Sequence, residues 1–276
     1  MSRPFLKMNG LGNDFVVVEA RSAPFRPTAA QARAIADRAT GVGCDQLIVI
    51  EPSEAADARM RIWNADGGEV GACGNATRCV GWLLLQAAGR DEVAIETEAG
   101  VLRARSAAGG VTVDMGPPGL DWRQIPLAEA MDTRGIELQV GPIDAPVLHT
   151  PGAVSMGNPH VVFFVADAEA APVREAGSLI ERHPLFPEGV NVGFCEVRAR
   201  DRVRLRVWER GVGETAACGT GACAAVVAAA RRGLTDRRAE VLANGGALRI
   251  DWRESDDHVL MTGPVAVEFT GTLPDG

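Results

Sequence analysis

Two cysteines of this chain lie in nearly the same sequence setting. Cys73 lies in "GEVGACGNATRC" (68–79) and Cys218 in "GETAACGTGACA" (213–224), each followed by glycine, a short polar residue and an apolar run. A helix N-terminus exposes unpaired N–H groups and carries partial positive charge. That field favours a thiolate, so we expect a lowered cysteine pKa, and the open N–H groups can hold a carboxylate.

Two such thiols, facing one carbon from opposite sides, could remove a proton and return another. The composition argues against the usual helpers in this chemistry. The chain has no tyrosine to act as a phenolic acid and one lysine, Lys7, whereas pyridoxal phosphate needs a lysine for its Schiff base. The chain has no C-x-x-C pair and only four scattered histidines, which argues against zinc. We therefore expect proton transfer without pyridoxal phosphate or a zinc site.

Several amide side chains are candidates for binding a substrate. Gln46, Asn64 and Asn191 lie in or beside apolar segments, where a buried amide needs hydrogen-bond partners. Asn13 and Asn158 each follow a glycine, so a plain turn role remains an alternative for them.

Charged candidates cluster before the second cysteine. The pair Glu209–Arg210 takes the place that Asn64–Ala65 has before Cys73. Arginine can bind a carboxylate through two hydrogen bonds and glutamate can pair with an ammonium group, although a solvated ion pair is the alternative. His160 lies close to Asn158 in the sequence and could support a nearby thiol.

The elements that must position these residues occur twice. When the chain is shifted by 145 positions, the separation of Cys73 and Cys218, "MRIWNADGGEVGACGN" (60–75) aligns with "LRVWERGVGETAACGT" (205–220). The same shift aligns "GNDFVVV" (12–18) with "GNPHVVF" (157–163), and Gln46 with Asn191. Three segments sharing one ungapped offset indicate a duplicated α/β unit.

Each half combines many short strands with one helix that is apolar on all sides. Helices are expected at 28–40, 74–89, 172–182 and after Cys218. Because the helices that follow the two cysteines are too apolar for a surface, we expect an α/β (α+β) fold, with each half a curved, mostly antiparallel sheet wrapped around a central helix. The remaining cysteines are expected to be reduced core residues: Cys44, Cys79, Cys195 and Cys223.

The Pro/Gly cluster "MGPPGLDW" (115–122) predicts a domain boundary. We expect an N-terminal domain at 1–117 and a C-terminal domain at 118–263, with the strand in 264–276 returning to the first sheet. The net charge of −8 argues against a nucleic-acid partner, and no apolar run resembles a signal peptide or a membrane span. We therefore expect a soluble cytoplasmic protein.

Taken together, the motifs resemble those of the diaminopimelate epimerase family. The resemblance rests on "KMNGLGNDFVVV", "WNADGGEVGACGNATRC", "GNPHVV", "WERGVGETAACGTGACA" and "ANGGAL", and it covers essentially the whole chain. It implies two pseudo-symmetric domains, a homodimer, no cofactor and no metal, and interconversion of LL- and meso-2,6-diaminopimelate in lysine and peptidoglycan-precursor synthesis. It also implies Cys73 and Cys218 as the two catalytic bases. The binding positions it implies are Asn13, Gln46, Asn64, Gly74, Asn75, Asn158, Asn191, Glu209, Arg210, Gly219 and Thr220.

Two alternatives remain at this stage. Proline racemases and hydroxyproline epimerases carry related cysteine turns, but their cyclic substrate lacks the second amino-acid centre that Asn, Glu and Arg side chains could bind. A redox-switch binding protein could instead use Cys73 and Cys218 as a reversible disulfide. Activity toward LL-diaminopimelate separates these readings.

Overall fold

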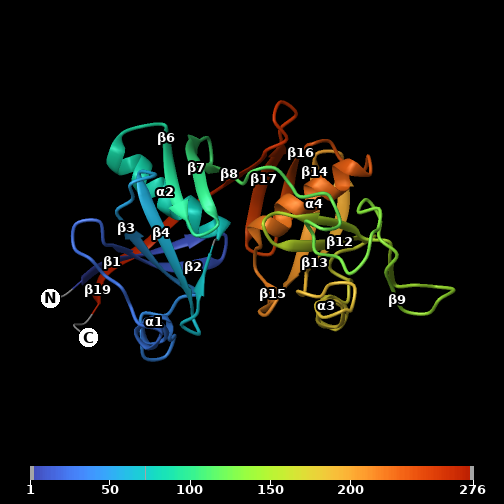
Figure 1. Ribbon diagram of the computed structural model, residues 1–276, viewed down its shortest axis with the longest axis horizontal. Coiled ribbons are helices and arrows are strands. Elements are labelled where there is room, and N and C mark those ends of the chain that lie inside the picture. Colours follow the sequence, from blue (N-terminus) through green and yellow to red (C-terminus); the bar gives the residue numbers. More distant parts are fainter. Residues whose placement is uncertain (1–2, 72, 274–276) are drawn as a thin grey trace. The chain divides into compact units, whose positions relative to one another are not determined.

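The computed structural model describes residues 3–71 and 73–273, which form two compact units. Unit 1 contains the chain up to Asp114 together with the segment from Thr262 onward, and unit 2 is Met115–Met261 (Figure 1). The predicted domain boundaries, 1–117, 118–263 and 264–276, remain a prediction, and their outermost residues lie outside the described ranges.

Unit 1 is a sheet with two helices. Its strands are β1 (Arg3–Gly10), β2 (Asn13–Glu19), β3 (Gln46–Glu51), β4 (Ala58–Asn64), β5 (Glu69–Val70), β6 (Glu92–Thr97), β7 (Gly100–Ala107), β8 (Gly110–Asp114) and β19 (Ala266–Leu273). Its helices are α1 (Ala29–Ala36) and α2 (Gly74–Ala88). Most pairings are antiparallel, while β2 with β3 and β4 with β6 are parallel. The late strand β19 pairs with β1.

Unit 2 repeats this plan. Its strands are β9 (Gln139–Val140), β10 (Leu148–His149), β11 (Gly152–Ser155), β12 (Pro159–Phe164), β13 (Asn191–Ala199), β14 (Arg202–Glu209), β15 (Gly213–Thr215), β16 (Arg238–Ala243) and β17 (Gly246–Trp252), and β18 (Val259–Gly263) runs across the boundary between the units. Its helices are α3 (Val173–Ile180) and α4 (Gly219–Arg231). Here β12 with β13 and β14 with β16 are the parallel pairs.

The duplication extends to the strand register. Phe15 lies opposite Gln46 in the β2–β3 pair, and the equivalent His160 lies opposite Asn191 in the β12–β13 pair. The predicted repeat and the predicted fold class are therefore confirmed.

The apolar strands are buried because helices cover both of their faces. In β2, Val16 and Val18 belong to the core cluster that contains Ala32 of α1, while alternate residues such as Phe15 are fully buried on the opposite face. The sequence of a strand that is covered on both faces is a continuous apolar run, as "FVVV" of β2 is.

Helices α2 and α4 are the central helices that the sequence predicts. Helix α2 packs against β1, β2, β6, β7 and β8, and α4 against β11–β14, β16 and β17. Ten of the residues in each helix are buried, which explains their apolar character on all sides. The four cysteines predicted to be core residues, Cys44, Cys79, Cys195 and Cys223, are buried, as predicted.

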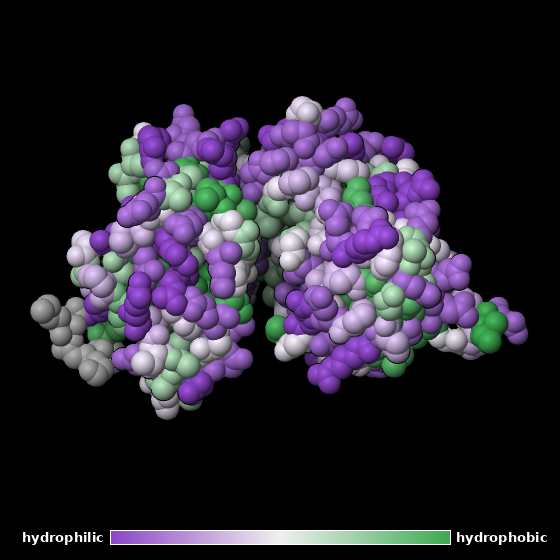
Figure 2. Space-filling view, in the orientation of Figure 1, coloured by the Kyte–Doolittle hydropathy of each residue, from purple (hydrophilic) through white to green (hydrophobic). Residues whose placement is uncertain are grey.

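One local prediction was wrong, and some short strands were not predicted. Helix α1 ends at Ala36 instead of near residue 40, because the Asp37 carboxylate accepts hydrogen bonds from the backbone N–H groups of Ala39 (2.8 Å) and Thr40 (2.7 Å) and forms a turn there. Strands β9, β10 and β11 were not expected. The β9–β10 connection carries the exposed residues Ile143 (83% exposed) and Val147, and hydrophobic surface is visible at that tip (Figure 2).

Along the described residues, none of the helices combines the length and apolar character that crossing a membrane requires.

Candidate active site

Cys73 and Cys218 occupy the same structural position in their units. Each is the N-cap residue of a central helix with an extended backbone, at φ −150° and ψ 113° for Cys73 and φ −114° and ψ 109° for Cys218. Neither helix has a side-chain capping hydrogen bond at this end. The first turn of a helix is a general binding site for an anion.

In unit 1, the Cys73 thiol contacts Asn13. The Sγ atom donates to Asn13 Oδ1 across 3.8 Å, and Asn13 Nδ2 donates to Asp45 Oδ2 at 2.8 Å. Because the carboxylate can only accept, Asp45 fixes the orientation of the Asn13 amide and turns its oxygen toward the thiol.

A charged network holds Asp45 and Asn13 in place. Lys7 is buried and donates to Asp14 Oδ2 at 2.6 Å and to the Gly43 carbonyl. Arg38 donates to both Asp14 oxygens (3.0 and 2.9 Å) and to Asp45 Oδ1 (2.8 Å). Burial acts to raise the pKa of Asp14, but hydrogen bonds from Arg38 and Lys7 outweigh it and hold that pKa well below its usual range.

The amides Gln46 and Asn64 meet across the β3–β4 pair. Gln46 Nε2 donates to Asn64 Oδ1 at 2.9 Å, while Gln46 Oε1 is buried without a hydrogen-bond partner. A buried acceptor left unsatisfied by the protein is the feature expected of a group that binds a ligand donor such as an ammonium.

The first two turns of α2 carry two further buried polar side chains. Asn75 is buried, and its Oδ1 accepts from Arg78 Nη1 at 2.9 Å. Arg78 is fully buried one turn along the helix, so it orients the Asn75 amide. Gly74 begins the helix beside Cys73.

In unit 2, hydrogen bonds connect a histidine to the second thiol. His160 Nε2 lies 3.0 Å from Asn158 Oδ1, Asn158 Nδ2 donates to Thr220 Oγ1 at 3.3 Å, and Thr220 Oγ1 lies 3.6 Å from Cys218 Sγ. Burial, with a smaller contribution from Arg210, lowers the pKa of His160 to about 3. His160 is therefore a neutral imidazole that donates to Asn158.

The expectation of a lowered thiol pKa was wrong for Cys218. The residue is only 6% exposed, and burial raises its pKa well above the usual value, with the nearby Glu209 carboxylate adding to the effect. Desolvation thus outweighs the favourable helix terminus, and Cys218 is a thiol at neutral pH in this structure.

Asn191, Glu209 and Arg210 lie together at one end of β13 and β14. Asn191 Oδ1 accepts from the backbone N–H of Arg210 at 3.0 Å, and its Nδ2 donates to the Pro159 carbonyl at 2.9 Å. Glu209 Oε1 accepts from Thr215 Oγ1 at 2.5 Å. Asn191 thus holds the backbone of Arg210.

The structure gathers the predicted residues into two groups, one in each unit. Unit 1 holds Asn13, Gln46, Asn64, Cys73, Gly74 and Asn75, and unit 2 holds Asn158, His160, Asn191, Glu209, Arg210, Cys218, Gly219 and Thr220. The residues that orient these groups were not predicted from the sequence: Lys7, Asp14, Arg38, Asp45 and Arg78. Two features of the sequence could have indicated them: Arg78 lies within the apolar run of α2, and Lys7, the sole lysine, lies within β1.

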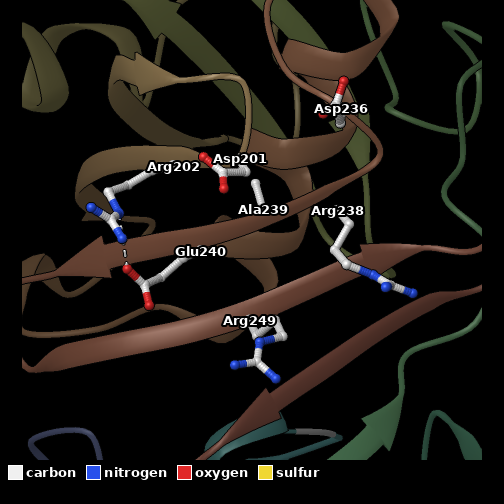
Figure 3. A pocket seen from close by; sticks show the side chains of 7 residues that line it. All are labelled: Asp201, Arg202, Asp236, Arg238, Ala239, Glu240 and Arg249. Carbon is white, nitrogen blue, oxygen red and sulfur yellow. Dashed lines mark ion pairs between the residues drawn. The ribbon is translucent and has the colours of Figure 1, made fainter.

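A hollow of about 370 Å³ on unit 2 contains none of these residues. Two of its arginines have acidic partners: Arg202 pairs with Glu240 at 3.2 Å (Figure 3), and Arg238 pairs with Asp251 at 2.5 Å. Within residues 3–71 and 73–273, no three His, Cys, Asp or Glu side chains group closely enough to hold a metal ion.

Comparison with known proteins identifies relatives over the whole chain. The family model described as diaminopimelate epimerase matches residues 5–120 and 152–268. A diaminopimelate epimerase from Phenylobacterium zucineum is 67% identical over 99% of this chain and 99% of its own length. A diaminopimelate epimerase from a Caulobacter species (strain K31) is 65% identical over 100% of this chain and 99% of its own length.

More distant solved structures share the fold. A phenazine biosynthesis protein from Bacillus anthracis superposes with a TM-score of 0.68 at 16% identity over 100% of both chains. A hydroxyproline epimerase from Agrobacterium vitis superposes with a TM-score of 0.67 at 18% identity, over 99% of this chain and 92% of its own. At these identities the likeness concerns the fold alone.

Proposed function

Since this chain belongs to the diaminopimelate epimerase family, we propose that it interconverts LL-2,6-diaminopimelate and meso-2,6-diaminopimelate, a step in lysine and peptidoglycan-precursor synthesis. Cys73 and Cys218 act as two bases on one α-carbon, and neither a cofactor nor a metal takes part. The observation that carries the proposal is the pair of cysteine N-caps at equivalent positions of a duplicated unit, each beginning a helix without a side-chain cap.

The chemistry requires stabilisation of a weakly acidic α-carbon as it loses its proton. First-turn N–H groups of Gly74 and Asn75 in α2, and of Gly219 and Thr220 in α4, bind the α-carboxylate in this proposal. These fixed donors stabilise the negative charge that develops in the transition state.

The unequal surroundings of the thiols suggest their starting roles. Because burial and Glu209 raise the pKa of Cys218, this residue holds its proton and begins as the acid. Cys73 takes the substrate proton in that direction, and to do so it must first lose the proton that it donates to Asn13 Oδ1 in this structure. The roles exchange in the reverse reaction.

The remaining polar groups bind the second amino-acid centre of the substrate. Arg210 binds the distal carboxylate, Glu209 meets an ammonium group, and the unsatisfied Gln46 Oε1 accepts from an ammonium. Asn13, Asn64, Asn158 and Asn191 complete the binding set, and His160 supports Asn158.

The decisive experiment incubates the reduced protein with LL-diaminopimelate and follows the loss of optical rotation. We expect the rotation to fall as the meso isomer forms, and expect no change with Cys73→Ala or Cys218→Ala. Racemisation of L-proline or epimerisation of trans-4-hydroxy-L-proline, without activity on diaminopimelate, would favour the cyclic-substrate alternative. A protein inactive on all three of these amino acids would favour the redox-switch alternative.

We also propose a cytoplasmic homodimer. Val267 (41% exposed) and Phe269 (48% exposed) on β19 support an apolar contact surface in unit 1. Light scattering coupled to size exclusion should give twice the chain mass, and Phe269→Glu should give a monomer. A monomeric wild-type protein would overturn the proposal.

A further inference from the structure

Glu181 is a buried carboxylate that the sequence analysis did not single out. It directly follows α3 and is only 9% exposed. Both oxygens accept hydrogen bonds: Oε2 from Trp208 Nε1 at 2.7 Å and Oε1 from the backbone N–H of Gly211 at 2.9 Å. These two donors lie on either side of the pair Glu209–Arg210, so one side chain fixes both ends of that pair.

The segment that begins at Glu181 also holds Arg210 itself. The Glu188 carbonyl accepts from Arg210 Nη1 at 2.7 Å, and Asn191 Oδ1 accepts from its backbone N–H at 3.0 Å. Gly189 has φ +71°, and a Cβ there would lie 3.0 Å from Arg210 Cδ. Residues 181–191 therefore contact the backbone, the aliphatic stem and the guanidinium of Arg210.

A carboxylate is the side chain that suits this position. Two N–H donors approach it, and each needs an acceptor oxygen. Glutamine would offer one acceptor and would turn its NH₂ group toward the other donor, which would be left without a partner. An ionised acceptor also makes stronger hydrogen bonds than a neutral one.

We propose that Glu181 is a positioning residue that sets the guanidinium of Arg210 for the distal carboxylate of the substrate. The proposal rests on the proposed function, in which Arg210 binds that carboxylate. Glu181 acts through Trp208 and Gly211 and does not itself touch the substrate.

The test is Glu181→Gln, with Glu175→Gln on the exposed face of α3 as the matched control. We expect Glu181→Gln to raise KM for LL-diaminopimelate at least about tenfold, with kcat changed less than about threefold, because the loss concerns binding. Glu175→Gln should leave both constants at their wild-type values. An unchanged KM in a folded Glu181→Gln protein would overturn the proposal.

A double-mutant cycle with Arg210→Lys separates positioning from general stability. If Glu181 acts through Arg210, its substitution should add little to the loss already caused by Arg210→Lys. Losses that multiply in the double variant would assign Glu181 a structural role and overturn the proposal.

Two further measurements keep the test decisive. Hydrogen exchange at the Gly211 amide should be faster in Glu181→Gln, and this readout does not depend on activity. If Glu181→Gln does not fold, Trp208→Phe removes one donor and retains the Gly211 contact, so a smaller rise in KM is expected, and a wild-type KM would overturn the proposal. A wild-type protein inactive on diaminopimelate would instead contradict the proposed function.

Discussion

Individual residues make the two thiols unequal although the units that carry them are duplicates. Cys73 is half-buried beside an amide, whereas Cys218 is buried and feels the Glu209 carboxylate. Burial is the larger cause of the raised pKa of Cys218, and Glu209, which stands where unit 1 has Asn64, adds to it. A carboxylate in unit 2 at the position of an amide in unit 1 thus adds to the inequality of the two thiols.

This cause can be tested by removing the charge. In a Cys73→Ala background, Glu209→Gln should lower the pKa of Cys218, because an anion near a thiol disfavours the thiolate. The pH dependence of thiolate absorbance near 240 nm measures the pKa of Cys218 in the two proteins.

Glu188→Gln serves as the control, since Glu188 is exposed and accepts from Arg210 through its main-chain carbonyl. An unchanged titration of Cys218 in Glu209→Gln would show that burial alone sets its protonation.

Arg210→Lys tests the binding role at the same scale. Lysine presents a point charge and cannot reproduce a planar contact through two hydrogen bonds. We expect kcat/KM for LL-diaminopimelate to fall more than about tenfold, roughly 1.4 kcal/mol of transition-state binding. Steady-state kinetics measure this loss, and a kcat/KM near the wild-type value would show that Arg210 does not bind the substrate.

Among the secondary-structure elements, the central helices and core strands bury thiols other than the two proposed bases. Burial raises the pKa of Cys79 in α2 and of Cys195 in β13 to about 12. In the unfolded chain a thiol titrates near pH 8.5, so the unfolded state loses its proton first as the pH rises. Each buried thiol therefore stabilises the fold fully below that pH, and this contribution is lost between about pH 8.5 and pH 12.

The free energy of unfolding should accordingly fall in mildly alkaline solution. Urea titrations at pH 7.5, 9 and 10 should show this loss, and Cys195→Ala should lose about 1 kcal/mol less than the wild type between pH 9 and pH 10. Equal losses in the two proteins would show that Cys195 does not titrate in the unfolding reaction.

The elements also show how far the sequence alone could lead. The shared offset predicted the positions of α2 and α4, because a long and mostly apolar helical segment has to lie in the core of its unit. It did not reveal the Lys7–Asp14–Arg38–Asp45 network, because its members come from separate segments and only the tertiary fold brings their charges together. The raised pKa of Cys218 could not be predicted for a similar reason. The sequence motif shows that the thiol lies at a helix terminus, but the extent of its burial depends on the packing around it.

For the molecule as a whole, the two-base mechanism predicts an isotope pattern. A thiol holds one proton. If the thiol that accepts the substrate hydrogen is shielded from solvent during the reaction, it can return only that same hydrogen to the substrate. In heavy water, early product should carry deuterium at the inverted carbon while recovered substrate keeps its hydrogen.

Proton NMR of both isomers at low conversion measures this labelling. Equal early labelling of substrate and product would contradict two shielded monoprotic bases. Either cysteine-to-alanine variant should fail to invert the substrate.

The pairing of β1 with β19 has a consequence for biosynthesis. It joins parts of the chain as far apart as Asn9 and Glu268, whose side chains lie 3.0 Å apart and 259 positions apart in sequence. Contacts between such distant segments form slowly, because a long loop must close before they add stability. Unit 2 is one continuous segment, Met115–Met261, and can complete its sheet while the chain is still being translated. Until β19 emerges from the ribosome, β1 has an open edge on its β19 side, and a nascent chain stalled at that point exposes a strand that chaperones or other nascent chains can capture.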